Sequence, residues 1–301
     1  MEIRSQFTVI LQGRGDYFGK EIGQLSNHAH GVSGTVYAAD ETTIVITGFS
    51  FDGVPPETFL WVGTSDSPSQ DGRIVFHSPS KEKLGVYNNA EISASMPPGT
   101  KITDFKWISV WCVSAKANFG EVYIPTDFVA PAPHSLGPLP TKHHEVSASS
   151  VWILDSRTLL FVNFTYDGEG PDTYFWAGNT SEPNVNGSWL YWSSRRETIL
   201  PVGRPFTGED VTVYLPATFN MFDITYVSVW CQEAIVDFGS ITFDPASFNL
   251  PAANVIRSRP HYGKLIGDLV NATSGVAGRV FAVDQSTFLI EDFSYNGLKP
   301  Y

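Results

Sequence analysis

Internal repetition is the feature of this sequence that most restricts its fold. Residues 19–53 and 263–297 are identical at 17 of 35 aligned positions, without a gap. A more diverged copy ends at Gly168, which lies 115 residues after the corresponding Gly53. The pairing continues from FLWVGTSDSP to YFWAGNTSEP at the same spacing. Because a repeat of this length can bury a core of its own, the sequence predicts tandem copies of one small domain.

The repeats divide the chain into three parts. Copy one covers residues 17–130 and copy two covers residues 134–250, whereas residues 261–301 hold only the start of a third copy. About forty residues cannot bury a core alone, so we expect this third copy to be truncated. The seams VAPAPHSLGPLP and NLPAANVIRSRP are rich in proline and alanine, which predicts linkers between domains.

The local pattern is that of β-strands throughout. Residues 36–38 and 44–51 alternate and are rich in β-branched and aromatic residues, with a turn between them. The FDG, YDG and YNG triplets predict further turns, because Asp-Gly and Asn-Gly tolerate positive φ. No stretch keeps a 3.6-residue apolar period over three turns. We therefore predict an all-β chain of tandem small antiparallel β-sandwich, or barrel-like, domains.

Charge and composition exclude some functions. The net charge is −12, which repels a phosphate backbone, so we expect no nucleic-acid partner. No apolar run is long enough to span a membrane, and the run Phe7–Leu11 is too short for a signal peptide. The segment therefore either begins inside a longer chain or belongs to a cytosolic protein. Four N-x-S/T sequons favour an extracellular protein. They lie at Asn163, Asn179, Asn186 and Asn271.

The chain has two cysteines, one in each copy of the phrase SVWC. Alternation in a strand places Cys112 with Ile108 and Val110, on the more core-like face, and Cys231 occupies the equivalent position. One interpretation is a buried and inert thiol. The other is a redox or ligand site, which requires a positive neighbour or a metal. Candidate neighbours are His30, His77, Lys116, His143 and His144.

The spacing does not support a metal site, because neither a C-x-x-C motif nor a fixed Cys–His spacing occurs. A disulfide between the two cysteines would require equivalent strands of two domains to meet, so we expect none. No catalytic triad, carboxylate pair or dinucleotide motif repeats between the copies, and we therefore expect no catalytic residues. Whether the chain is an enzyme stays open, with the non-enzymatic interpretation favoured.

Aromatic and acidic residues repeat as well, and each set has two interpretations. The tryptophans are either packing residues or a surface that stacks on sugars; they are Trp61, Trp111, Trp176 and Trp230. The turn residues either close hydrogen-bonded turns or contribute to a cation or polar-ligand site, although one carboxylate is poor support for the latter. They are Asp52, Asp167 and Asn296.

Taken in order, the GKEIGQLSNHAHGVSG opening, FLWVG, and SVWC followed by FG resemble the DM thirteen domain, which occurs in tandem in arthropod proteins of the Skeletor and Knickkopf type. The resemblance implies a β-rich extracellular module connected with cuticle organisation and chitin, upstream of a DOMON-like domain. It also implies the redox role suggested for the family's cysteine, carried over here onto Cys112 and Cys231. Copy two departs from the pattern at residues 147–149, where Ser-Ala-Ser replaces Val-Ser-Gly.

Three functions remain open at this point. The first is a non-catalytic module of an extracellular matrix or cuticle, with matrix components and chitin as partners. The second is a redox accessory domain that uses one cysteine per repeat. The third is an intracellular scaffold. We expect no cofactor in this segment, and haem or copper only through a partner domain elsewhere on the chain.

Overall fold

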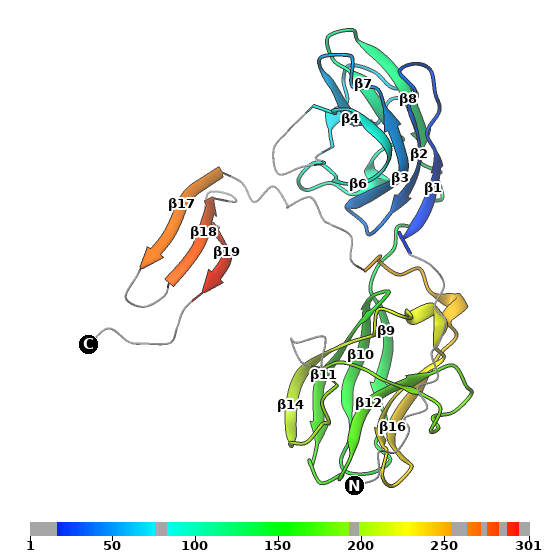
Figure 1. Ribbon diagram of the computed structural model, residues 1–301, viewed down its shortest axis with the longest axis vertical. Helices are drawn as coiled ribbons and strands as arrows, with labels where there is room; N and C mark the ends of the chain where they lie inside the picture. Colours follow the sequence, from blue (N-terminus) through cyan, green and yellow to red (C-terminus); the bar gives the residue numbers. More distant parts are fainter. Residues whose placement is uncertain are drawn as a thin grey trace.

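The computed structural model describes residues 17–75, 77, 83–192, 199–253, 264–271, 276–282 and 288–294. Almost all of its regular structure is β, and every strand pairing is antiparallel (Figure 1). Two four-stranded sheets form each of the first two domains. The predicted tandem β-sandwich fold is confirmed.

Domain 1 contains two sheets whose strands interleave in sequence. The first sheet, in spatial order, is β1 (Lys20–Gln24), β2 (Ser33–Ala38), β3 (Thr43–Phe51) and β6 (Tyr87–Ser95). The second is β5 (Arg73–Ile74), β4 (Thr58–Gly63), β7 (Trp107–Cys112) and β8 (Ala117–Tyr123), with the short 3₁₀ turn η1 (Ile102–Asp104) before β7. The two strands predicted from the sequence correspond to β2 and β3.

Domain 2 repeats this order strand for strand. Its first sheet is β9 (His134–Leu139), β10 (Ala148–Asp155), β11 (Thr158–Tyr166) and β14 (Phe206–Tyr214). Its second sheet is β13 (Ser188–Trp189), β12 (Thr173–Gly178), β15 (Tyr226–Cys231) and β16 (Val236–Thr242). The 3₁₀ turns η2 (Met221–Asp223) and η3 (Pro245–Ser247) lie before β15 and after β16.

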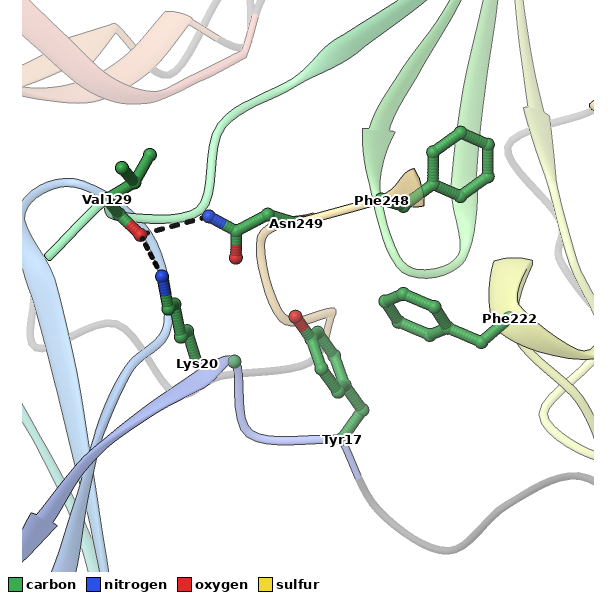
Figure 2. A pocket seen from close by; sticks show the side chains of 7 residues that line it. Tyr17, Lys20, Val129, Phe222, Phe248 and Asn249 are labelled. Atoms are coloured by element: carbon green, nitrogen blue, oxygen red, sulfur yellow. Dashed lines mark hydrogen bonds between the residues drawn. The ribbon is translucent and has the colours of Figure 1, made fainter. Parts of the chain in front are cut away.

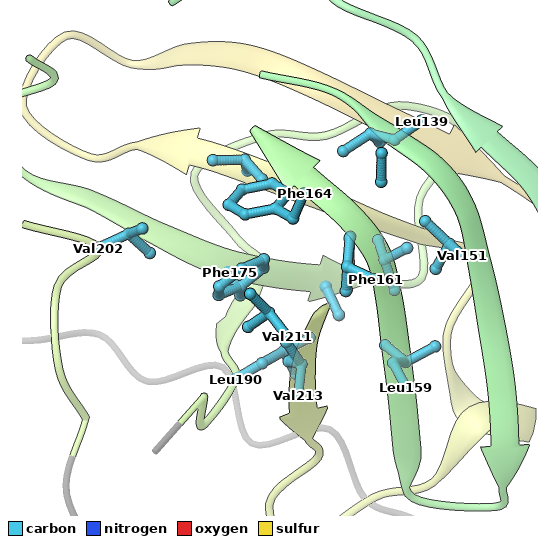
Figure 3. Packing of buried hydrophobic residues seen from close by; sticks show 14 of the residues in the cluster. Leu139, Val151, Leu159, Phe161, Phe164, Phe175, Leu190, Val202, Val211 and Val213 are labelled. Atoms are coloured by element: carbon cyan, nitrogen blue, oxygen red, sulfur yellow. The ribbon is translucent and has the colours of Figure 1, made fainter. Parts of the chain in front are cut away.

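The core of each domain lies between its two sheets. In domain 2, Leu159 and Phe161 of β11 pack with Phe175 of β12 (Figure 3), and Val229 of β15 belongs to the same buried cluster. Alternate residues of a strand point to opposite faces, so these inner faces alternate with outward-facing positions. The equivalent residues of β3, β4 and β7 form the core of domain 1.

A three-stranded sheet follows in the third copy. It consists of β17 (Lys264–Asn271), β18 (Val276–Ala282) and β19 (Phe288–Ser294). Lys264 pairs with Ala282 as Lys20 pairs with Ala38, and the register shifts at Gly267 as it does at Gly23. The described part of the third copy therefore repeats the first three strands of domain 1, including their β-bulge. Asn296 lies outside the described residues.

The first predicted linker is largely a strand. Residues 134–139 form β9, the edge strand of domain 2, rather than a free connection. Pro138 lies within this strand, and an edge strand tolerates proline because one side of its backbone needs no ladder hydrogen bond. The composition of the seam was therefore misleading, and domain 2 begins directly at this strand.

The second seam also has a structural role, because residues 249–253 connect the two domains through the main chain. The Ala252 N–H donates to the carbonyl of Ala39, in the β2–β3 turn of domain 1, at 2.7 Å. The Ser156 N–H, in the β10–β11 turn of domain 2, donates to Pro251 O at 2.9 Å. We call residues 249–253 the strap. It lies between the two turns and joins the domains end to end (Figure 1).

Side chains of domain 1 and of the strap itself reinforce the contact with domain 1 (Figure 2). The Tyr17 hydroxyl donates to Leu250 O at 2.7 Å, and the Asn249 amide donates to Val129 O at 3.0 Å. Lys20 donates to the same Val129 carbonyl at 3.2 Å. The strap is therefore hydrogen-bonded to the beginning and to the end of domain 1.

These contacts predict that the double variant Tyr17→Phe/Asn249→Ala loosens the junction. Each change removes one hydrogen bond, and together they should cost about 1–3 kcal/mol of local stability. Subtilisin should then cleave residues 126–133 at least about fivefold faster than in the wild type. The control Asn88→Ala removes an exposed amide of β6, far from the strap, and should leave cleavage unchanged. Equal cleavage rates in all three proteins would contradict the strap.

Candidate functional site at the cysteine end of each domain

Each cysteine is the last residue of the central strand of its second sheet. Cys112 pairs with Thr58 of β4, and Cys231 pairs with Thr173 of β12. Cys112 is 1% exposed and Cys231 is 0% exposed, and each belongs to the core of its domain. The core-facing position predicted from strand alternation is confirmed.

Hydrogen bonds surround the sulfur of Cys112. Its Sγ lies 3.4 Å from the Ser114 hydroxyl oxygen. Burial raises the pKa of this thiol, but hydrogen bonds from Ser114, the Ala115 N–H, Thr58 and the Glu57 N–H together lower the pKa below its usual value. The neutral donors thus favour the thiolate without a neighbouring cation.

Cys231 has a sparser polar environment. Its sulfur accepts a hydrogen bond from the Ala234 N–H at 3.5 Å. Nearby, the Tyr166 hydroxyl donates to the Thr173 hydroxyl at 3.1 Å and accepts from the Gly170 N–H at 2.9 Å. Among the described residues, no histidine, lysine or arginine is hydrogen-bonded to either sulfur. The sequence had suggested such partners.

A histidine–aspartate pair lies at the same end of each domain, because Asp52 and Asp167 directly follow β3 and β11. His30 Nδ1 lies 2.9 Å from Asp52 Oδ2, and His144 Nδ1 lies 2.9 Å from Asp167 Oδ2. The backbone also repeats, since each aspartate N–H donates to the carbonyl of its histidine at 3.2 Å. Each histidine ring packs against the phenylalanine of the Phe-Gly pair in its domain. The ring centroids lie 4.4 Å apart for His30 and Phe119, and 4.3 Å apart for His144 and Phe238.

Sequence comparison missed this pair. The alignment at a spacing of 115 places Glu145, not His144, opposite His30, because copy two has one extra residue between this loop and its aspartate. The signal was present in the spacings of 22 and 23 residues between histidine and aspartate. The two aspartates do close turns, accepting the N–H of Val54 and of Glu169, respectively. The Val54 N–H, followed by His30, lowers the pKa of Asp52.

The four tryptophans proposed as binding aromatics are at most 9% exposed. They lie on the outer face of the second sheet, under the β4–β5 loop and its equivalent in domain 2. The indole N–H of Trp61 donates to Ser69 O, and that of Trp176 donates to Asn184 O, both at 3.0 Å. A Cβ on Gly187 would clash with the indole ring of Trp176, so the loop approaches the ring closely. This arrangement favours packing over sugar stacking for Trp61, Trp111, Trp176 and Trp230.

The structure describes the side chains of three of the four sequon asparagines. Asn163, Asn179 and Asn186 are exposed in domain 2, whereas Asn271 lies in β17, where its side chain is not described.

Cys112 and Cys231 are both free, at ends of the two domains that point away from the strap. Strands of nine residues, about 30 Å each, separate each cysteine end from the strap, which accounts for the absence of a disulfide between them.

Both domains have the same fold and the same arrangement at the cysteine end, so they are two copies of one domain type. The chain belongs to the family of that domain. The sequence profile described as "Electron transfer DM13" matches residues 24–124 and 139–243. Protein Skeletor, isoforms B/C, of Drosophila melanogaster is 36% identical over 238 residues, covering 78% of this chain and 30% of that protein. Isoforms D/E are also 36% identical over 238 residues, covering 78% of this chain and 16% of theirs.

The chain therefore spans less than a third of the length of these Skeletor relatives. No solved structure matches the chain. In the part of the chain that the structure describes, no helix has the length and apolar character that a membrane span requires.

The burial of the thiols predicts the effect of cysteine variants. Cys231→Ser places a hydroxyl in an apolar core and should cost about 1–3 kcal/mol, whereas Cys231→Val should be milder. Thermal unfolding of each variant measures this difference, and thiol labelling of the native chain should be slow at both cysteines. Cys112→Ser should be better tolerated than Cys231→Ser, because hydrogen-bond donors already surround Sγ of Cys112. Fast native labelling with unchanged melting temperatures would contradict the core role.

Proposed function

We propose that this chain is a non-catalytic module of an extracellular matrix, of the cuticle type. The observation that carries the proposal is the burial of both thiols, which are at most 1% exposed and belong to the cores of their domains. Thiol chemistry requires access to a thiolate, and a domain that buries the same cysteine in both copies uses it for packing. The similarity to Skeletor and the exposed sequons support an extracellular setting.

The contact with the matrix is proposed at the junction of the two domains. A pocket of about 500 Å³ is lined by Tyr17, Phe222 and Phe248, together with Lys20 and Asn249 (Figure 2). Ligand sites often lie between domains, and sugar rings pack on aromatic faces beside hydrogen-bonding groups. Burial raises the pKa of Tyr17 to about 12, so its hydroxyl, protonated at neutral pH in any case, remains a hydrogen-bond donor into the alkaline range. The proposed ligand is a chain of chitin or a related matrix polysaccharide.

Sedimentation with insoluble chitin tests this contact. The wild-type chain should co-sediment, and Phe222→Ala/Phe248→Ala should lose most of the bound fraction, because two ring faces are removed. Tyr123→Ala is the control, since it removes an exposed aromatic side chain on β8 that does not line the pocket. Failure of the wild type to bind chitin, or equal binding by the double variant, would reject the polysaccharide as the ligand.

Secretion tests the extracellular setting separately. Expressed behind a signal peptide in insect cells, the chain should carry N-glycans, and peptide N-glycosidase should lower its apparent mass. Asn179→Gln and Asn186→Gln should each remove one step of that shift, because both side chains are exposed. A secreted chain without any shift would count against glycosylation of these sequons.

A second function is supported by one observation. The lowered pKa of Cys112 favours its thiolate, which is the state that electron transfer through this residue would require. In this alternative Cys112 is the redox centre, and haem or copper is supplied by a partner domain elsewhere on the chain. Titration of the Cys112 thiol in a Cys231→Val background distinguishes the two. A reactive thiolate at neutral pH would favour the redox role over the matrix role.

A further inference from the structure

Three side chains that can ligate a metal ion converge at the cysteine end of domain 2. His144 lies in the loop before β10, and Asp167 and Glu169 lie in the turn after β11. One ligand atom from each lies within 4.8 Å of the other two. An imidazole nitrogen and two carboxylate oxygens form a donor set typical of zinc and similar divalent ions.

In the part of the chain that the structure describes, the carboxylates of this cluster have no lysine or arginine partner. Within the described residues, no lysine or arginine forms an ion pair with Asp167 or Glu169, and His144 is the only side chain at hydrogen-bond distance from the Asp167 carboxylate. Two carboxylates held close together repel each other, and a divalent cation would offset that repulsion. The Glu169 N–H donates to Asp167 Oδ1 at 2.8 Å, which fixes the direction of this carboxylate.

We propose that domain 2 binds one divalent cation, of the class of Zn²⁺, through His144, Asp167 and Glu169. The side chains of His144 and Asp167 are 34% and 24% exposed, so an ion can enter and water can complete its coordination. His144 Nδ1 and Asp167 Oδ2 lie 2.9 Å apart. Two tetrahedral ligands at about 2.0–2.1 Å from zinc lie about 3.3 Å from each other. A small opening of this pair therefore makes room for the ion between them.

Domain 1 provides an internal comparison. Its His30 and Asp52 form the same pair at the same 2.9 Å distance, but Val54 occupies the position of Glu169. The side chain of Val54 points to solvent and is 74% exposed. Domain 1 therefore offers two ligands where domain 2 offers three. The proposed ion should bind at the second domain and bind more weakly, or not at all, at the first.

Isothermal titration of the chelator-treated full chain with zinc chloride tests this assignment. The wild type should bind one equivalent, and Glu169→Val should weaken binding at least about tenfold by reducing domain 2 to the ligand set of domain 1. Val54→Glu should add a second equivalent. Glu182→Val is the matched control, because it removes an exposed glutamate of domain 2 outside the cluster.

Stability measurements distinguish a loss of zinc binding from a loss of folding. Circular dichroism and the melting temperature without zinc should be unchanged in Glu169→Val, since this glutamate is exposed, so a loss of binding cannot be ascribed to unfolding. Zinc should raise the melting temperature of the wild type and of Glu182→Val, but not of Glu169→Val. A wild type that shows no saturable binding up to millimolar zinc would overturn the proposal. Binding unaffected by Glu169→Val would overturn it equally.

Discussion

In the second sheet of each domain, the strand that carries the cysteine is buried on both faces, and the arrangement of the rest of the domain follows from this. All six residues of β7 and all six of β15 are buried. One face packs in the sandwich core, and the other lies beneath the loop that covers the tryptophans. A strand covered on both faces must end where its sheet meets solvent-facing loops, and in both domains it ends at the cysteine. The cysteine end is therefore a boundary between a closed core and polar loops.

Much of this organisation follows from the sequence, because alternation and repetition directly express burial. The pattern in SVWC placed each cysteine on the core face, and the turn triplets correctly separated the strands around Asp52 and Asp167. The strap and β9 could not be found in the same way. Their proline and alanine content fits linkers as well as edge strands, and main-chain hydrogen bonds such as that from Ala252 leave no mark on composition.

The histidine–aspartate pairs were missed for a different reason. Their partners come from loops whose lengths differ by one residue between copies, so comparison at a constant spacing separates them. Only the fold shows that His144 occupies the position of His30. The presence of Glu169 where domain 1 has Val54 also indicates a third metal ligand only when the two loops are superposed by their shared hydrogen bonds. The third ligand of the candidate metal site thus comes from a position where the copies differ, whereas the fold depends on residues where they agree.

The strap has a consequence for how the pair of domains can evolve and bear load. Its contacts with both turns are made by main-chain carbonyl groups, which every residue type possesses, and by N–H groups, which every type except proline possesses. Substitutions in the turns therefore leave the bonding groups in place, and the angle between the domains can persist while their sequences diverge. Tension applied along the unit would be shared between the covalent connection at residues 124–133 and the hydrogen bonds of the strap. An assembly of such units would then behave as a chain of stiff segments whose bending is set by the main chain.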